Sequence, residues 1–136
     1  MLRLPLSLLS PPGHRGRLSI LIFHRVLAEP DGLFPETPTA VGFEACMRWV
    51  NGWFNVLPLT EAVARLYAGM IPSRALAITF DDGYADNEAL AAPILKRLGM
   101  TATFFVSTGF LEGGCMWNDR VIEAVRASEC AQIDLR

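Results

Sequence analysis

The sequence predicts an α/β fold built on a parallel sheet. Short apolar runs rich in β-branched and aromatic residues alternate with segments whose apolar residues recur at helical spacing. Four such strand–helix units follow one another along the 136 residues. This alternation favours parallel strands joined by right-handed crossover helices. Four units amount to half of a barrel or to most of a small open sheet.

The composition allows one modest apolar core and excludes several classes of protein. The chain is 51% hydrophobic, and its 12 basic and 14 acidic residues give a net charge of −2. Nucleic-acid-binding proteins carry a concentrated basic face, so we expect no nucleic-acid partner. No apolar run approaches the ~18 residues of a transmembrane helix. The three cysteines have no C-x-x-C spacing, which argues against a disulfide framework or a thiolate zinc site.

Residues 1–17 form an N-terminal segment ahead of the first strand. Residues 1–10 are apolar and mildly cationic, but prolines interrupt them and the apolar core is short for an export signal. We expect a short amphipathic segment here, with a cleaved signal as the alternative. The location of the protein stays open between the cytoplasm and the cell envelope.

The first unit begins at residues 18–23, a near-continuous apolar run that is typical of a strand buried on both faces. Residues 29–38 hold three prolines and a glycine and form a loop. A helix is predicted over residues 43–51, because Phe43, Cys46, Met47 and Val50 recur at helical spacing. Gly52 fits the end of this helix.

The second unit is a short strand over residues 54–57, stopped by Pro58, and then a helix for which Thr60 is the expected N-cap. The apolar helical positions that follow are Val63, Leu66 and Tyr67. The strand of the third unit covers residues 75–80.

The third helix is predicted over residues 86–98, with Pro93 either kinking it or starting its second half. Residues 101–106 form the fourth strand, again rich in β-branched and aromatic residues. The last helix contains Val121, Ile122 and Val125, and Asn118 or Asp119 can cap it.

Two adjacent carboxylates, Asp81 and Asp82, follow the strand of residues 75–80, and Gly83 permits a turn there. An ionised carboxylate at the exit of a buried strand needs a partner or a metal. Folds of this class place their chemistry at the carboxyl ends of the strands. One carboxylate on a metal and the other acting as a general base would be a useful division of labour. The alternative is a polar turn in which Asp82 or Asp86 caps the next helix.

The segment Thr79-Phe80-Asp81-Asp82-Gly83-Tyr84 resembles the first motif of the polysaccharide deacetylases, the NodB-homology or carbohydrate esterase family 4 group. The resemblance runs from about residue 18 to residue 118. It implies that residues 18–136 are the N-terminal part of a deacetylase domain, a deformed (β/α) barrel. Three further segments resemble parts of that family: Ile22-Phe23-His24-Arg25-Val26, Pro93-Ile94-Leu95-Lys96 and Ala102-Thr103-Phe104-Phe105-Val106.

The resemblance implies metal-dependent hydrolysis of N-acetyl, occasionally O-acetyl, groups on an acetylated polysaccharide or oligosaccharide. It assigns Asp81 as the base and Asp82 as a ligand of a divalent metal, commonly zinc. The second motif of the family, His-Ser/Thr-x-x-His, supplies two more ligands and is absent, since His14 and His24 both precede the first motif. A catalytic zinc usually needs three protein ligands. We therefore expect an incomplete domain that is inactive alone, or alternatively a non-catalytic carbohydrate-binding or interaction remnant of the fold.

Three more residues are candidates for the pocket. His24 ends the first strand at the same sheet edge as the carboxylates, where it can hydrogen-bond Asp81 or the substrate, bind the metal or be structural. Arg25 pairs with a carboxylate there or lies on the surface, and Tyr84 lines the pocket or covers the turn.

Half a barrel also leaves strand edges open, so self-association is expected.

Overall fold

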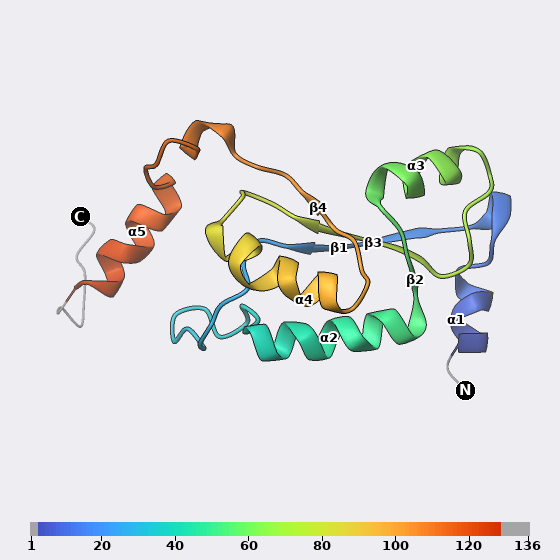
Figure 1. The fold of residues 1–136 in the computed structure, drawn as a ribbon, viewed down its shortest axis with the longest axis horizontal. Coiled ribbons are helices and arrows are strands. Elements are labelled where there is room, and N and C mark those ends of the chain that lie inside the picture. Colours follow the sequence, from blue (N-terminus) through green and yellow to red (C-terminus); the bar gives the residue numbers. More distant parts are fainter. Residues whose placement is uncertain (1–2, 129–136) are drawn as a thin grey trace, which may run out of the picture. The chain divides into compact units, whose positions relative to one another are not determined.

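The computed structural model describes residues 3–128, and it confirms the parallel α/β fold. Residues up to Val106 form one compact unit, and residues from Ser107 onward form a second. The sheet belongs to the first unit and is built around β3 (Ala75–Phe80) (Figure 1). Three strands pair with β3 in parallel: β1 (Leu18–Phe23), β2 (Asn55–Val56) and β4 (Thr103–Phe104). The bounds of β1 and β3 are those expected, whereas β4 is shorter than residues 101–106.

The register of β1 against β3 decides which residues meet at the end of the sheet. Leu18 lies opposite Ala75 and Phe23 opposite Phe80, so the two strands end at the same level. The Asp81 N–H then donates to the Phe23 carbonyl at 2.9 Å, which extends the pairing by one residue. The chain segments that leave β1 and β3 are therefore neighbours.

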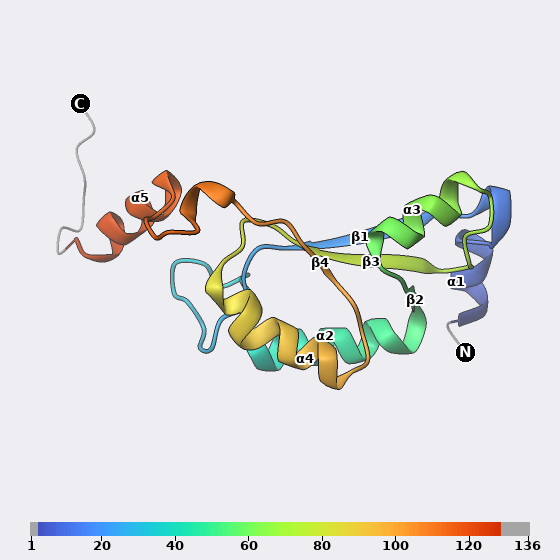
Figure 2. The same cartoon turned by 45° about the horizontal axis from the view of Figure 1, so that its top comes forward.

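Helices α2 (Ala40–Trp53) and α4 (Ala92–Arg97) lie side by side along the sheet (Figures 1 and 2). The N-cap of α2 is Thr39, whose side chain accepts from the Gly42 N–H at 3.3 Å. This cap starts the helix three residues before the predicted residue 43, and Gly52 lies inside the helix rather than at its end.

Helix α3 (Leu59–Tyr67) follows β2, as the sequence predicts. The expected role of Thr60 is wrong, however. Pro58 occupies the N-cap position, no side chain caps the helix, and Thr60 lies in its first turn. The fixed φ of proline already suits the entry into a helix, so the helix begins two residues earlier than a cap at Thr60 would allow.

The predicted helix of residues 86–98 is divided near Pro93, as expected. A π-helical segment (Asn87–Ala91) precedes α4, and the Ala92 N–H donates to the Asn87 carbonyl, five residues earlier. Proline has no N–H, and its ring crowds the carbonyl of the residue four positions before it. The wider π turn provides the room that the proline ring needs.

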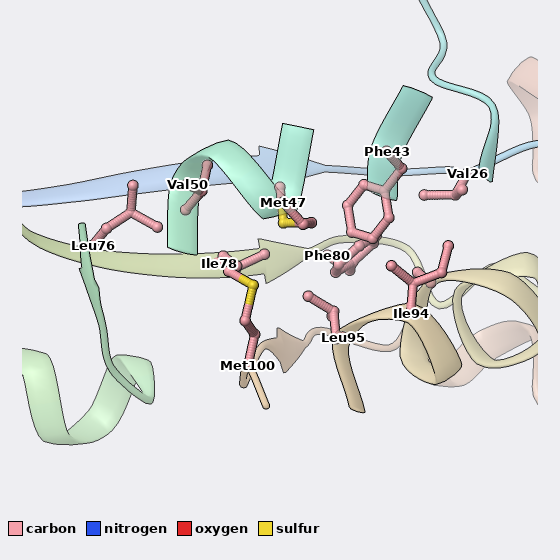
Figure 3. Close-up of a cluster of buried hydrophobic side chains, with 11 residues drawn as sticks. Val26, Phe43, Met47, Val50, Leu76, Ile78, Phe80, Ile94, Leu95 and Met100 are labelled. Carbon is pink, nitrogen blue, oxygen red and sulfur yellow. The ribbon is translucent and has the colours of Figure 1, made fainter. Parts of the chain in front are cut away.

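The core lies between β3 and the two helices α2 and α4 (Figure 3). Phe43 and Met47 of α2 and Phe80 of β3 are fully buried. Every residue of β3 is buried, because β3 has strands on both sides in the sheet and α3 contacts it as well. The other labelled members of the cluster are Val26, Val50, Leu76, Ile78, Ile94, Leu95 and Met100.

The expected burial of β1 on both faces is wrong. Leu21 and Phe23 pack against the core, but Ile20 is 47% exposed and Ile22 60% exposed. Successive side chains of a strand point to opposite faces. The face that carries Leu21 and Phe23 packs against the core, whereas Ile20 and Ile22 on the other face are left exposed in the described part of the chain.

Helix α1 (Arg3–Leu9) and a short 3₁₀ helix (Gly13–Arg15) belong to the first unit. The Gly13 N–H donates to the Ile71 carbonyl and the Arg74 N–H donates to the Ser10 carbonyl, both at 2.9 Å. These bonds attach the N-terminal segment to the start of β3.

The second unit contains a 3₁₀ turn (Thr108–Phe110) and helix α5 (Trp117–Arg126). The N-cap of α5 is Met116, without a side-chain cap, so the predicted capping by Asn118 or Asp119 is wrong. Both residues lie in the first turn, where the Asp119 charge still favours the helix dipole. Within residues 3–128, no helix has the length and apolar character that a bilayer crossing requires.

Candidate functional site

The floor of the candidate site is a row of phenylalanines at the ends of three strands. The Phe80 ring stacks on Phe23 of β1 at a centroid distance of 5.4 Å and on Phe104 of β4 at 5.0 Å. Offset aromatic pairs at such distances add to the stability that burial provides. This stacking holds the three strand ends together, and the residues that directly follow the strands are positioned by it.

Asp82 and Gly83 turn the chain sharply after β3. Asp82 has a φ of 72° and Gly83 a φ of 75°, so two successive residues are left-handed. Glycine adopts this conformation freely, while aspartate does so at a cost of about 1 kcal/mol. Strained residues of this kind concentrate at functional sites, where the surrounding structure holds them. The turn keeps Asp81 and Asp82 at the sheet edge and directs the chain toward the next helix.

The close contact between the turn and Val106 also requires a glycine at position 83. A Cβ atom at this position would lie 2.8 Å from Val106 Cγ1 and 3.1 Å from Val106 Cα. Real Cβ atoms essentially never lie within 3.0 Å of another heavy atom, so the Val106 side chain would have to shift, and the contact with its Cα would also be tight. The segment that follows β4 therefore packs directly against the turn.

The structure brings His24 and Asp82 together. His24 Nε2 lies 4.0 Å from Asp82 Oδ2, and the two side chains are 59% and 32% exposed. Asp81 is partly exposed, and within the described part of the chain its carboxylate has no hydrogen-bond or ion-pair partner. An acceptor-only group in this state has its lone pairs available to a substrate or a water.

The described residues do not complete a metal site. Among residues 3–128, no three His, Cys, Asp or Glu side chains are close enough to hold an ion together. Catalytic zinc usually takes three protein ligands. Asp82 and its neighbour His24 therefore offer at most part of a ligand set.

Arg25 forms the carboxylate pair that the sequence suggested, and its partner is Asp86. Arg25 Nε donates to Asp86 Oδ2 at 2.8 Å, and the Asp86 side chain is only 13% exposed. The guanidinium carbon also lies 4.6 Å from the centre of the Tyr84 ring. Tyr84 thus stacks against Arg25, beside the turn.

Asp86 and Asn87 are functional candidates that the sequence reasoning missed. Asp86 Oδ1 accepts from the Val26 N–H at 3.2 Å. Asn87 is buried, and with its amide nitrogen turned inward it donates to the His24 carbonyl at 3.0 Å. The alternative role of Asp86 as a helix cap is wrong, because its side chain makes no cap bond. The sequence signal that could have identified them is that two adjacent polar residues, Asp86 and Asn87, start the helix predicted over residues 86–98.

Comparisons with known sequences agree with these motifs. Residues 69–130 match the family model described as polysaccharide deacetylase. The chain is 39% identical over 93 residues to YxkH of Bacillus subtilis (strain 168), which bears the provisional name of a polysaccharide deacetylase. The match covers 66% of this chain and 32% of YxkH, so the chain spans about a third of that relative.

Solved structures with the same fold include a de-N-acetylase from Aggregatibacter actinomycetemcomitans, with a TM-score of 0.63 and 22% identity over 80% of this chain and 50% of that one. IcaB from Ammonifex degensii gives a TM-score of 0.59 and 23% identity, over 86% and 50%. The deacetylase PplD of Streptococcus pyogenes, solved with acetate, gives 0.59 and 21%, over 80% and 52%. Identities this low establish the fold alone, and the chain spans about half of each structure.

Proposed function

We propose, from the resemblance to polysaccharide deacetylases that these matches confirm over part of the chain, that the protein takes part in hydrolysing acetyl groups from an acetylated carbohydrate polymer. The main support for this proposal is the arrangement of three side chains. Asp81 and Asp82 follow the central strand at its carboxyl end, and His24 lies 4.0 Å from Asp82 at the end of the neighbouring strand. A carboxylate pair beside an imidazole at this edge suits acyl hydrolysis.

Asp81 is the general base in this proposal. A water molecule attacks the carbonyl carbon of the acetamide while Asp81 accepts one of its protons. The C–N bond then breaks, the leaving nitrogen takes up one proton in exchange for the one that Asp81 accepted, and the products are acetate and a free amino sugar. The Asp81 carboxylate is partly exposed and has no partner among residues 3–128, which supports this role. A positioned base typically contributes about 10²–10⁴-fold to the rate.

Asp82 is one ligand of a divalent metal, with zinc as the first choice. Such an ion polarises a carbonyl oxygen and lowers the pKa of a bound water when it is present. The described residues supply too few donors for a complete site. The proposal therefore places the remaining ligands outside them, and it predicts that the 136-residue chain alone does not deacetylate.

His24 and Tyr84 are proposed to contact the substrate side of the site. The His24 imidazole is 59% exposed, so a sugar can reach it without a change in the fold. It can hydrogen-bond the substrate while it stays beside Asp82. Arg25 is proposed to act only through its contacts with Asp86 and Tyr84, because these occupy its charged head.

The test measures acetate released from an acetylated chito-oligosaccharide by the full-length gene product. We expect release that a chelator stops and added zinc restores. The 136-residue chain measured in parallel should release none and should bind zinc weakly. Tight stoichiometric zinc binding with acetate release by that chain would contradict the incomplete site. Oligosaccharide binding without any acetate release would instead favour the non-catalytic alternative.

A further inference from the structure

The segment that leaves β1 is attached to the start of the helix after β3 by several polar contacts. Asp86 Oδ2 accepts from Arg25 Nε at 2.8 Å, and Asp86 Oδ1 accepts from the Val26 N–H at 3.2 Å. In the amide orientation that satisfies both of its ends, the Asn87 side-chain nitrogen donates to the His24 carbonyl at 3.0 Å and to Asp86 Oδ1 at 3.3 Å. Three consecutive residues, His24, Arg25 and Val26, are therefore held by two consecutive residues of another element.

These contacts are of the kind that fix a backbone. Asn87 is 3% exposed, and a buried amide that lost its partners would be costly. The bond from Arg25 to Asp86 joins two charged groups, and such bonds are shorter and stronger than neutral ones. The Asp86 side chain is 13% exposed and that of Arg25 45%, so the pair is partly buried and salt screens it less than a fully exposed pair.

These contacts set the position of His24. Its backbone carbonyl is tied to Asn87, and the next two residues are tied to Asp86, while its own imidazole is free to lie 4.0 Å from Asp82. Tyr84 packs on the Arg25 guanidinium at 4.6 Å and so joins the turn of Asp82 and Gly83 to the same set of contacts. The position of His24 relative to the carboxylates is thus set from the helix that follows them.

We infer that Asp86, assisted by Asn87, is a positioning residue that holds His24 beside Asp82. The inference rests on the proposed function in one respect: it assumes that the His24 imidazole contacts the substrate. Asp86 itself touches neither substrate nor metal in this scheme. It acts through the backbone of residues 24–26.

A double-mutant cycle on the full-length gene product tests this coupling. Asp86→Ala should lower kcat for acetate release about tenfold, because small displacements of a catalytic group are costly, and should leave KM nearly unchanged. Asp86→Asn should have a smaller effect, since its oxygen can still accept from Val26. In a His24→Ala background, Asp86→Ala should lower kcat no further, because the group that it positions is gone.

Glu44→Gln is the matched control. Glu44 accepts from Arg48 at 2.6 Å and from Arg97 at 2.7 Å, lengths close to that of the Arg25–Asp86 pair, but it lies on α2 and neither of these partners is a residue of the site. It should leave kcat unchanged. A loss of kcat in Asp86→Ala that persists undiminished in the His24→Ala background would overturn the inference.

Amide exchange separates this inference from the proposed function. The Val26 amide should exchange about tenfold faster in Asp86→Ala, because it loses a bond to a charged acceptor, and at the wild-type rate in Glu44→Gln. Unchanged Val26 exchange in Asp86→Ala would overturn the contact scheme whatever the activity. If the wild-type protein releases no acetate, the proposed function is refuted. If Asp86→Ala still accelerates Val26 exchange in that case, the attachment of residues 24–26 to Asp86 stands.

Discussion

His24 Nε2 lies 4.0 Å from Asp82 Oδ2, although the two residues follow different strands far apart in the sequence. The parallel register of β1 and β3 brings them together, because Phe23 and Phe80 pair as the last residues of both strands. The left-handed turn at Asp82 then keeps its carboxylate at this edge. Three predictions concern this turn, and a fourth concerns the ion pairs of Glu44 on α2.

Asp81→Asn should lower kcat for acetate release about 10²–10⁴-fold, because the amide cannot accept the proton of the attacking water. The side chain keeps its size, so KM and the free energy of unfolding should change little. Steady-state kinetics on the full-length gene product measure the effect. Retention of more than a tenth of the wild-type kcat by this variant would rule out Asp81 as the base.

Substitutions of Asp82 should separate stability from metal binding. Asp82→Gly should be more stable than Asp82→Ala by about 1 kcal/mol, because the φ of 72° suits glycine and strains alanine. Both variants should lose the same ligand and bind zinc equally poorly. Urea denaturation and zinc titration measure the two properties, and equal stability of the variants would contradict the strained conformation.

Gly83→Ala should destabilise the protein by about 1–3 kcal/mol, since it combines a φ of 75° with a Cβ 3.1 Å from Val106 Cα. Gly52→Ala is the control. Gly52 lies inside α2 with nothing within 4 Å of an added Cβ, so alanine should stabilise that helix by about 0.5–1 kcal/mol. Opposite signs in urea denaturation are the expected result, and a neutral Gly83→Ala would show that the turn tolerates a side chain.

The acid sensitivity of the protein should depend in part on Glu44. Hydrogen bonds from Arg48 and then Arg97 hold the pKa of the Glu44 carboxyl below its ordinary value of 4.5. A lowered pKa in the folded state means that the interaction stabilises the protein above pH 4.5 and is lost as the pH falls through the lowered value. The stability difference between wild type and Glu44→Gln should therefore be constant near neutral pH and shrink in acid. A difference independent of pH would refute the ion pairs.

Much of the fold could be predicted from local patterns. The bounds of β1 and β3 were predictable because each is a near-continuous run of apolar residues followed by polar ones. Helix ends were less predictable: Thr39 caps α2 but Thr60 does not cap α3, since Pro58 already starts that helix. The exposure of Ile20 and Ile22 was not predictable, because it depends on which faces of the sheet other segments cover.

The sequence by itself determined the carboxylate pair, its place after a buried strand and the family resemblance that gives the pair a chemistry. Only the tertiary structure decided what lies around it. Asp86 pairs with Arg25 and Val26, and Asn87 with the His24 carbonyl, because a parallel register and a π turn before Pro93 bring two distant segments into contact. Local sequence patterns record propensity and periodicity within one element. They do not record which side chains of different elements come within hydrogen-bond distance.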